Sequence, residues 1–319
     1  MKSKKNILLF EPWHFGDLVI ASGIARELKA SGYNVSIAYN YKWESWVKHC
    51  DYFTVAYPVN IPWVARNFKE KYNLKKYGLN FWRNGIQLSK SLRVDFVVDM
   101  RGDIRNIFYL RFFFPFKKLI KLPNEKVVNV YHKKNFLFEK LNIVNLLPEK
   151  DAISFAIKSI IPNIVLFAGA TDYNRSLPRA KLHEMFHMLA NMNVACTLIL
   201  EPSADVNSWK KFFEQLGRNK FDFIQADLFT VATCIQKADI VVSTDSGWLH
   251  IGHYYKKKLI GLFGFDTTNS WAPPGAIILL PDKMYDASLR YKKEYHNIQP
   301  LQELNMDNFK KALLSLLEE

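Results

Sequence analysis

The sequence has few cysteines and no long apolar run, and both absences limit what the protein can be. Its three cysteines, Cys50, Cys196 and Cys234, are scattered and have no C-x-x-C spacing, so neither a disulfide framework nor a zinc site is indicated. No stretch reaches the roughly 20 apolar residues that span a bilayer, and the apolar run at residues 6–10 is too short for a signal peptide. We therefore expect a soluble cytoplasmic protein that at most attaches to a membrane surface.

Several catalytic motifs are also missing. The loop after the first apolar run has one glycine, Gly16, before Asp17, and this argues against the G-x-G-x-x-G fingerprint of an NAD enzyme. There is no P-loop, no G-x-S-x-G, no H-E-x-x-H and no D-x-D pair for a divalent metal. His183 and His187 are four residues apart but lack a third ligand, so we interpret them as a packing or surface pair. Chemistry without a metal or another cofactor is favoured.

The charge of the chain is unevenly distributed. The formal charge of +14 lies in residues 1–150, which hold 26 Lys and Arg against 12 Asp and Glu, whereas residues 151–319 hold 18 of each. The segments 66–76 and 111–121 interleave basic and aromatic residues, which suits an anionic lipid surface or a nucleic acid. An ordinary solvated basic face is the alternative. Because no nucleic-acid-binding motif accompanies these residues, a nucleic-acid partner is not favoured.

Strand and helix patterns alternate along both halves of the chain. Short continuous apolar runs are typical of strands that a parallel sheet buries on both faces, and helical spacing separates several of them. The expected strands are residues 6–10, 34–39, 94–100, 163–169, 195–200, 239–244 and 257–264, and the expected helices include residues 18–32, 180–192 and 306–319.

This alternation predicts an α/β protein of two Rossmann-like domains whose parallel sheets face each other across a cleft. With 319 residues, 49% of them hydrophobic, the chain can form two cores. We place the domains at residues 1–155 and 156–319. The last helix, residues 306–319, is amphipathic and is a candidate for packing back on the first domain.

A polar turn between a strand and a helix is the most informative junction. It contains Thr244, Asp245, Ser246 and Gly247. Such a turn directs backbone N–H groups and the positive end of a helix dipole beyond the strand, where a diphosphate binds. His250, one turn into the helix, is placed to face the same anion. The alternative is an ordinary helix cap with a buried core histidine.

Other strand ends also carry charged residues. Asp17 stands where a loop enters a helix, so its carboxylate either caps that helix or serves as a general base, with His14 as a candidate partner. Arg101 and Asp103 follow a later strand and either hold a polar or phosphorylated acceptor or form surface ion pairs.

The start of the second domain adds cations after a strand. Arg175, Arg179 and Lys181 follow the strand expected at residues 163–169. Guanidinium and ammonium groups in this position can meet the oxygens of a phosphate.

Four segments together point to one family. They are Pro12 with Gly16 and Asp17 (P-x-x-x-G-D), residues 99–103 (D-x-R-G-D), residues 245–250 (D-[ST]-G-x-x-H) and residues 271–275 (W-x-P-x-G). In these segments the chain resembles glycosyltransferase family 9, the ADP-heptose:lipopolysaccharide heptosyltransferases. The similarity spans most of the chain and is weakest at residues 40–90 and 106–160.

The resemblance implies a GT-B fold and a metal-independent, inverting sugar transfer. The donor would bind the C-terminal domain, and the acceptor mainly the N-terminal domain. Asp17 falls on the family's catalytic base, residues 245–250 on its donor motif, and Arg175 on its basic residue before a proline. For the nucleoside, Glu201 and Asp205 are both candidates.

The resemblance also implies a substrate class. It suggests transfer of heptose from an ADP-linked sugar to a lipopolysaccharide core, an anionic membrane-anchored acceptor that a basic domain would attract at the inner face of the inner membrane. The family's P-G-A-S segment is altered at residues 167–176, so another nucleotide sugar is an alternative. A nucleotide-sugar epimerase or hydrolase on the same fold, and a non-catalytic binding protein, are the competing hypotheses.

Overall fold

The computed structural model describes residues 4–64, 79–124, 128–143, 161–170, 172–201, 204–216 and 220–318. The chain divides into two compact units, Met1–Leu146 and Leu147–Glu319. The predicted domain boundary, between residues 155 and 156, lies outside the described residues. Each unit is presented by itself below.

Unit 1 is built on a parallel sheet with the strand order β3-β2-β1-β4-β5. In its middle, Leu9 of β1 lies opposite Ile37 of β2 and Val98 of β4, and all three are fully buried. The chain runs from β1 outward to β3 and then returns to β4, so the strand order reverses between β1 and β4, where open α/β sheets bind ligands. The strands are β1 (Asn6–Glu11), β2 (Asn34–Asn40), β3 (Val55–Val59), β4 (Phe96–Asp99) and β5 (Lys118–Lys121).

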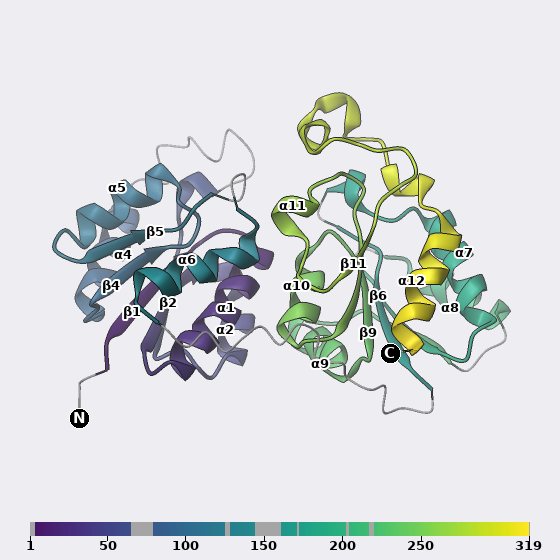
Figure 1. The fold of residues 1–319 in the computed structure, drawn as a ribbon, viewed down its shortest axis with the longest axis horizontal. Coiled ribbons are helices and arrows are strands. Elements are labelled where there is room, and N and C mark those ends of the chain that lie inside the picture. Colours follow the sequence, from purple (N-terminus) through teal and green to yellow (C-terminus); the bar gives the residue numbers. More distant parts are fainter. Residues whose placement is uncertain are drawn as a thin grey trace. The chain divides into compact units, whose positions relative to one another are not determined.

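Helices pack against this sheet (Figure 1). The long helix α1 follows β1 and contacts β1 and β2, with Leu18, Ile24 and Leu28 buried. It is followed by Gly32 at φ +88°, a left-handed conformation that only glycine adopts without a steric penalty. The α-helices of unit 1 are α1 (Phe15–Ala30), α2 (Glu44–His49), α4 (Leu79–Ser91), α5 (Ile104–Phe113) and α6 (Lys133–Lys140).

Unit 2 repeats the plan with a six-stranded parallel sheet in the order β11-β10-β9-β6-β7-β8. Leu166 of β6 lies opposite Leu198 of β7 and Val242 of β9. The strand order reverses between β6 and β9, which defines a second potential ligand site. The strands are β6 (Asn163–Phe167), β7 (Ala195–Ile199), β8 (Phe221–Ile224), β9 (Ile240–Thr244), β10 (Lys258–Leu262) and β11 (Ile277–Leu279).

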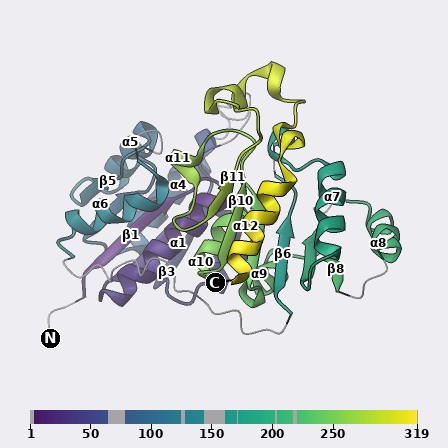
Figure 2. The same ribbon diagram turned by 45° about the vertical axis from the view of Figure 1, so that its right-hand side comes forward.

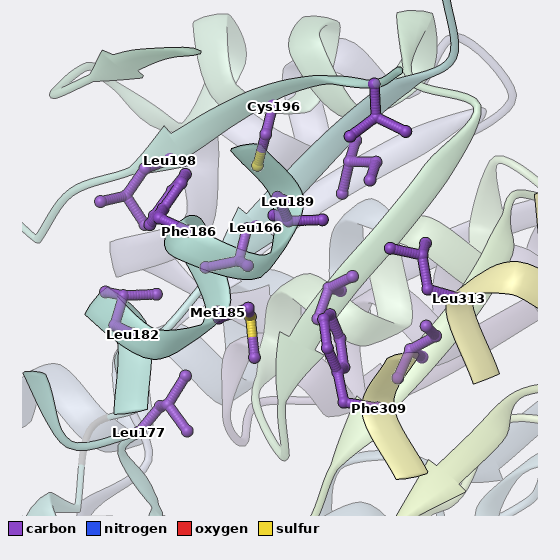
Figure 3. Packing of buried hydrophobic residues seen from close by; sticks show 14 of the residues in the cluster. Leu166, Leu177, Leu182, Met185, Phe186, Leu189, Cys196, Leu198, Phe309 and Leu313 are labelled. Carbon is purple, nitrogen blue, oxygen red and sulfur yellow. The ribbon is translucent and has the colours of Figure 1, made fainter. Parts of the chain in front are cut away.

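The hydrophobic core of unit 2 joins helices from both ends of its sequence to the sheet. Figure 3 shows Met185 and Leu189 in one cluster with Phe309 and Leu313 of the last helix. Each such side chain contributes about 1.5–3 kcal/mol when fully buried. The α-helices of unit 2 are α7 (Arg179–Ala190), α8 (Val206–Gln215), α9 (Leu228–Lys237), α10 (Gly247–Tyr254), α11 (Thr268–Trp271) and α12 (Met306–Glu318).

The last helix, α12, packs its apolar face on its own unit. Phe309, Leu313 and Leu316 bury its apolar face in the core of unit 2, and the helix contacts α7, β10 and β11 (Figure 2). The apolar stripe of this helix is therefore covered by its own unit, and its packing on the first domain stays a prediction. Among the helices that the structure describes, none is long and apolar enough to cross a membrane.

Candidate active site

The carboxylate of Asp17 lies beside the reversal of strand order in unit 1. Asp17 belongs to the first turn of α1, directly after β1, and its Oδ2 accepts a hydrogen bond from the backbone N–H of His14 at 3.3 Å. Its Oδ1 lies 3.1 Å from Nη1 of Arg101, which follows β4. Only 12% of the Asp17 side chain and 19% of the Arg101 side chain are exposed. The structure thus brings three predicted residues together, and Asp17 is both a helix-capping group and an ion-pair partner.

Arg101 is held from a second side by an aromatic ring. Its guanidinium carbon lies 4.4 Å from the centre of the Trp13 ring, a cation–π arrangement. Asp103 has a different role, because it caps α5 by accepting from the backbone N–H of Arg105 and also pairs with the Arg105 guanidinium at 2.6 Å. Of the two interpretations of this segment, Arg101 fits a site residue and Asp103 fits a local ion pair.

Glu11 is a buried acid beside Asp17 that the sequence analysis does not identify as a site residue. It is the last residue of β1, and it lines a narrow cavity together with Asp17, Met100 and Lys133. Burial raises the pKa of Glu11 well above its ordinary range, and the negative charge of Asp17 raises it further, against the opposing charges of Arg101 and Lys133. The Glu11 carboxyl therefore favours its neutral form beside the Asp17 carboxylate.

Asp99 is a second buried acid in this unit. Its Oδ1 accepts hydrogen bonds from Asn106 at 2.9 Å and from the backbone N–H of Arg101 at 3.3 Å, while its buried Oδ2 has no hydrogen-bond partner. Burial raises the pKa of Asp99 to about 6, although these hydrogen bonds oppose the shift. Asn106 in turn accepts from the indole N–H of Trp63 at 3.0 Å, so Asp99 belongs to a buried polar network.

We expect Asp99→Asn to change how the stability of unit 1 depends on pH. Asp99 binds its proton more tightly in the folded chain (pKa about 6) than at its ordinary pKa of 3.8, so its contribution to stability falls as pH rises from about 4 to about 6. The shift corresponds to about 3 kcal/mol. The free energy of unfolding of Asp99→Asn relative to wild type should rise by up to that amount between pH 4 and pH 7, measured by urea unfolding. Asp51→Asn, an exposed acid of the same unit, is the control; a difference that does not vary with pH would contradict the expectation.

In unit 2, Arg175 bridges the reversal of strand order. It lies in a short helical turn, Tyr173–Arg175, after β6, and its Nη1 donates to the backbone carbonyl of Asp245, directly after β9, at 2.6 Å. The same nitrogen lies 3.5 Å from the Asp245 carboxylate. Arg175 is buried, so the predicted donor residues of two strands meet here.

A second arginine completes a four-residue group. Arg290 lies 3.4 Å from the carboxylate of Asp245 and 3.5 Å from that of Asp172, and Arg175 lies 2.9 Å from Asp172. The Nε atoms of both arginines are buried and have no hydrogen-bond partner among the residues that the structure describes. The two acids differ in exposure, since 40% of the Asp172 side chain is exposed against 10% for Asp245. We call these four residues the arginine–aspartate group.

The predicted polar turn leads from this group into α10. The hydroxyl of Thr244 donates to the carbonyl of Gly169 at 2.7 Å, and Ser246, the residue before the helix, shares a hydrogen bond with Ser243 at 3.1 Å. Gly247 begins α10. His250 is buried one turn later, its ring 6.3 Å from that of Trp271. The first turn of α10 therefore lies next to Asp245.

The two candidate acids for the nucleoside are placed differently. The carboxylate of Glu201, after β7, lies against Gly169, after β6, so closely that a Cβ at residue 169 would collide with it. Asp205 instead caps α8, where it accepts from the backbone N–H groups of Asn207 and Ser208. Glu201 is therefore the candidate at the carboxyl end of the sheet.

Lys181 does not join the arginine–aspartate group. Its ammonium pairs with Glu184 at 2.9 Å, one turn further along α7, and it lines a separate hollow with Glu303 and Met306. In this structure α7 directs Lys181 to its helical neighbour, and its contact with the donor stays a prediction.

The two groups of residues suggest two kinds of chemistry. In unit 1, a largely buried carboxylate held by an arginine can take a proton from a substrate hydroxyl. In unit 2, two guanidinium groups beside a helix N-terminus can bind a diphosphate. Across the described ranges, no cluster of three or more His, Cys, Asp or Glu side chains is arranged to hold a metal ion.

Comparison with known proteins gives a family match for part of the chain and similar folds for nearly all of it. Residues 137–292 match the model of glycosyltransferase family 9 (heptosyltransferase). A family 9 glycosyltransferase from Veillonella parvula DSM 2008 has a similar structure, with 15% identity, a TM-score of 0.72 and coverage of 99% of this chain and 98% of that one. E. coli heptosyltransferase WaaC with ADP follows at 12% identity and a TM-score of 0.68, over 98% and 99% of the two chains. E. coli ADP-heptose lps heptosyltransferase II has 14% identity and a TM-score of 0.63, with coverage of 98% of each chain.

These similarities identify the class of protein. The two parallel α/β sheets match the GT-B fold of solved heptosyltransferase structures. Residues 137–292, nearly half of the chain, carry the sequence pattern of glycosyltransferase family 9. No curated protein gives a significant sequence match to the chain.

Proposed function

We propose that the protein transfers heptose from ADP-heptose to the core of a lipopolysaccharide or a related glycolipid, with inversion and without a metal. The observation that carries this proposal is the bond from Arg175 to the Asp245 carbonyl, which places a buried cation at the switch point of unit 2, beside the first turn of α10. The solved relatives support the donor class, since one contains ADP and another is named for ADP-heptose.

In this proposal the diphosphate binds to the arginine–aspartate group and to the first turn of α10. Arg175 and Arg290 supply the charge, and the half-exposed Asp172 gives up its place between them. Ser246 and Gly247 let the phosphates approach the helix N-terminus. Glu201 is assigned to the ribose hydroxyls of the nucleoside, because carboxylates accept hydrogen bonds from such hydroxyls.

Asp17 is the proposed base, and Arg101 and His14 hold it. Its carboxylate removes the proton from an acceptor hydroxyl while that oxygen forms a bond to the anomeric carbon from the face opposite the phosphate. The bond between the anomeric carbon and the diphosphate oxygen breaks, and the nucleoside diphosphate leaves with the electron pair. Asp17 ends the step protonated, and the anomeric configuration is inverted.

The acceptor and the place of action follow from charge. A lipopolysaccharide core is anionic and membrane-anchored, and the excess of basic residues lies in the first half of the chain. We therefore propose peripheral contact of unit 1 with the inner face of the inner membrane. The basic segment at residues 66–76 lies outside the described residues, whereas residues 111–121 are described.

A second candidate is a glycosyltransferase that uses another nucleotide sugar. The altered segment at residues 167–176 favours it, because this segment departs from the family pattern and its Ala170 and Ser176 lie just after β6, near the proposed nucleotide site. An epimerase or hydrolase on the same fold would consume nucleotide sugar without an acceptor, so turnover that depends on an acceptor separates transfer from both.

The donor assignment is tested by thermal stability in the presence of ADP, UDP, GDP and CMP. A ligand at about 100 times its dissociation constant should stabilise the protein by about 2.7 kcal/mol, and we expect ADP to give the largest shift. Calorimetric titration with the same nucleotides provides the affinities. A larger shift with UDP or GDP would favour the second candidate, and no shift with any of them would contradict the donor site.

A further inference from the structure

Helix α5 exposes a stripe of large apolar side chains. Ile104, Phe108 and Phe112 follow each other at intervals of four residues on one face, opposite the buried Leu110 and Phe113. Phe108 and Phe112 are 70% and 66% exposed, and Phe116, in the turn after the helix, is 97% exposed. Unit 1 therefore leaves uncovered the kind of side chain that soluble proteins bury.

Helix α4 extends this stripe. Trp82 and Ile86 are also exposed, and the Trp82 ring lies 5.1 Å from that of Phe112. The helices approach closely because Gly85 has no side chain: a Cβ there would collide with the Phe113 ring. Figure 1 shows these two contacting helices. We define the α4–α5 surface by the exposed apolar side chains on them and in the turn after α5, which are Trp82, Ile86, Ile104, Phe108, Phe112 and Phe116.

The charged residues of α4, of α5 and of the described segment after α5 are all basic. Arg83, Arg111, Lys117, Lys118 and Lys121 are all exposed on the same helices or in the segment that follows α5. Neither residues 79–94 nor residues 104–124 contain an acidic residue. Apolar side chains with a basic border match a bilayer with anionic head groups, because the chains enter the interface while the cations meet the phosphates.

We propose that the α4–α5 surface docks on an anionic lipid bilayer. This inference rests on the proposed function for the identity of the membrane acceptor, and it names the surface that meets that membrane. Ile104 directly follows Asp103, and Arg105 reaches the Trp13 ring, over which Arg101 also lies. The docked surface therefore begins within one helical turn of the residues that hold Asp17, which places the base at the membrane margin where a lipid-linked sugar is presented.

The test is sedimentation of the full chain with vesicles that contain phosphatidylglycerol. The combined variant Phe108→Ser, Phe112→Ser and Phe116→Ser should bind these vesicles at least about tenfold more weakly than wild type. Lys117→Glu with Lys118→Glu should weaken binding by a similar factor, and high salt should reproduce that loss in the wild type. Vesicles of phosphatidylcholine alone should bind the wild type weakly.

Matched measurements separate this surface from the proposed function. Phe229→Ser changes an exposed phenylalanine of unit 2 and should leave vesicle binding unchanged. Unaltered binding of the triple phenylalanine variant, or wild-type dimers that the variant converts to monomers, would overturn the proposal. ADP binding is measured on each protein: its absence from the wild type would count against the proposed function and leave the vesicle result to be judged by itself.

Discussion

Asp17→Asn should lower the rate of sugar transfer by about 10²- to 10⁴-fold, the usual contribution of a general base. Asparagine has nearly the same shape as aspartate and can still accept the hydrogen bond from the His14 N–H. The N-terminus of α1 should therefore stay capped. The amide cannot take the proton of an acceptor hydroxyl. The rate is measured as ADP released from ADP-heptose in the presence of a lipopolysaccharide-core acceptor.

The interpretation of that loss depends on nucleotide binding, which the proposal assigns to unit 2. The stabilisation of Asp17→Asn by ADP should equal that of the wild type, and Asp51→Asn, an exposed acid of unit 1, should keep full activity. Transfer at the wild-type rate by Asp17→Asn would show that another group is the base, and the buried Glu11 would be the next to test.

Arg175→Met should weaken ADP binding by about 10- to 100-fold, since a charge-assisted contact to phosphate is worth roughly twice a neutral hydrogen bond. Methionine keeps much of the apolar stem but removes the guanidinium that reaches the Asp245 carbonyl and the Asp172 carboxylate. Calorimetric titration with ADP measures the change.

Two further variants show whether the loss of ADP affinity in Arg175→Met comes from the missing charge or from a disturbed fold. Arg175→Lys keeps the charge but loses the planar fork, so its affinity should lie between those of the wild type and Arg175→Met. Arg179→Met removes an exposed arginine at the start of α7 and should bind ADP normally. Equal affinity of Arg175→Met and wild type would remove Arg175 from the donor site. Loss of unfolding cooperativity in Arg175→Met would make Arg175→Lys the deciding variant.

The strands that sequence patterns missed share one physical property. β3 and β5 are the two edges of the first sheet, and β8 and β11 are the two edges of the second. Edge strands are covered less completely, so they lack the continuous apolar run that identifies a central strand. β5, for example, exposes the lysines at both of its ends, and β3 contains Pro58, which removes a backbone donor and reads as a strand breaker.

The candidate site residues also divide into those that lie in a local sequence pattern, which can be predicted, and those that do not. The polar turn at residues 244–247 was predicted, because a strand, a turn and a helix are consecutive in sequence. Arg290 was not, since it reaches Asp172 and Asp245 from a segment more than 40 residues away that has no motif. Glu11 carried one usable signal, an acid that ends a buried strand, but Lys133 reaches the same cavity from α6 without any local pattern.

The half-exposed carboxylate of Asp172 gives the arginine pair an internal counter-ion. In the proposed donor site an incoming anion must displace this carboxylate, so binding exchanges one ion pair for another and part of the gain from charge is offset. We therefore expect inorganic phosphate, which brings nothing else, to compete poorly, whereas a ligand that also contributes a nucleoside gains contacts that Asp172 cannot offer. In this proposal, discrimination between a nucleotide sugar and the abundant small anions of a cell originates in a residue that the ligand replaces.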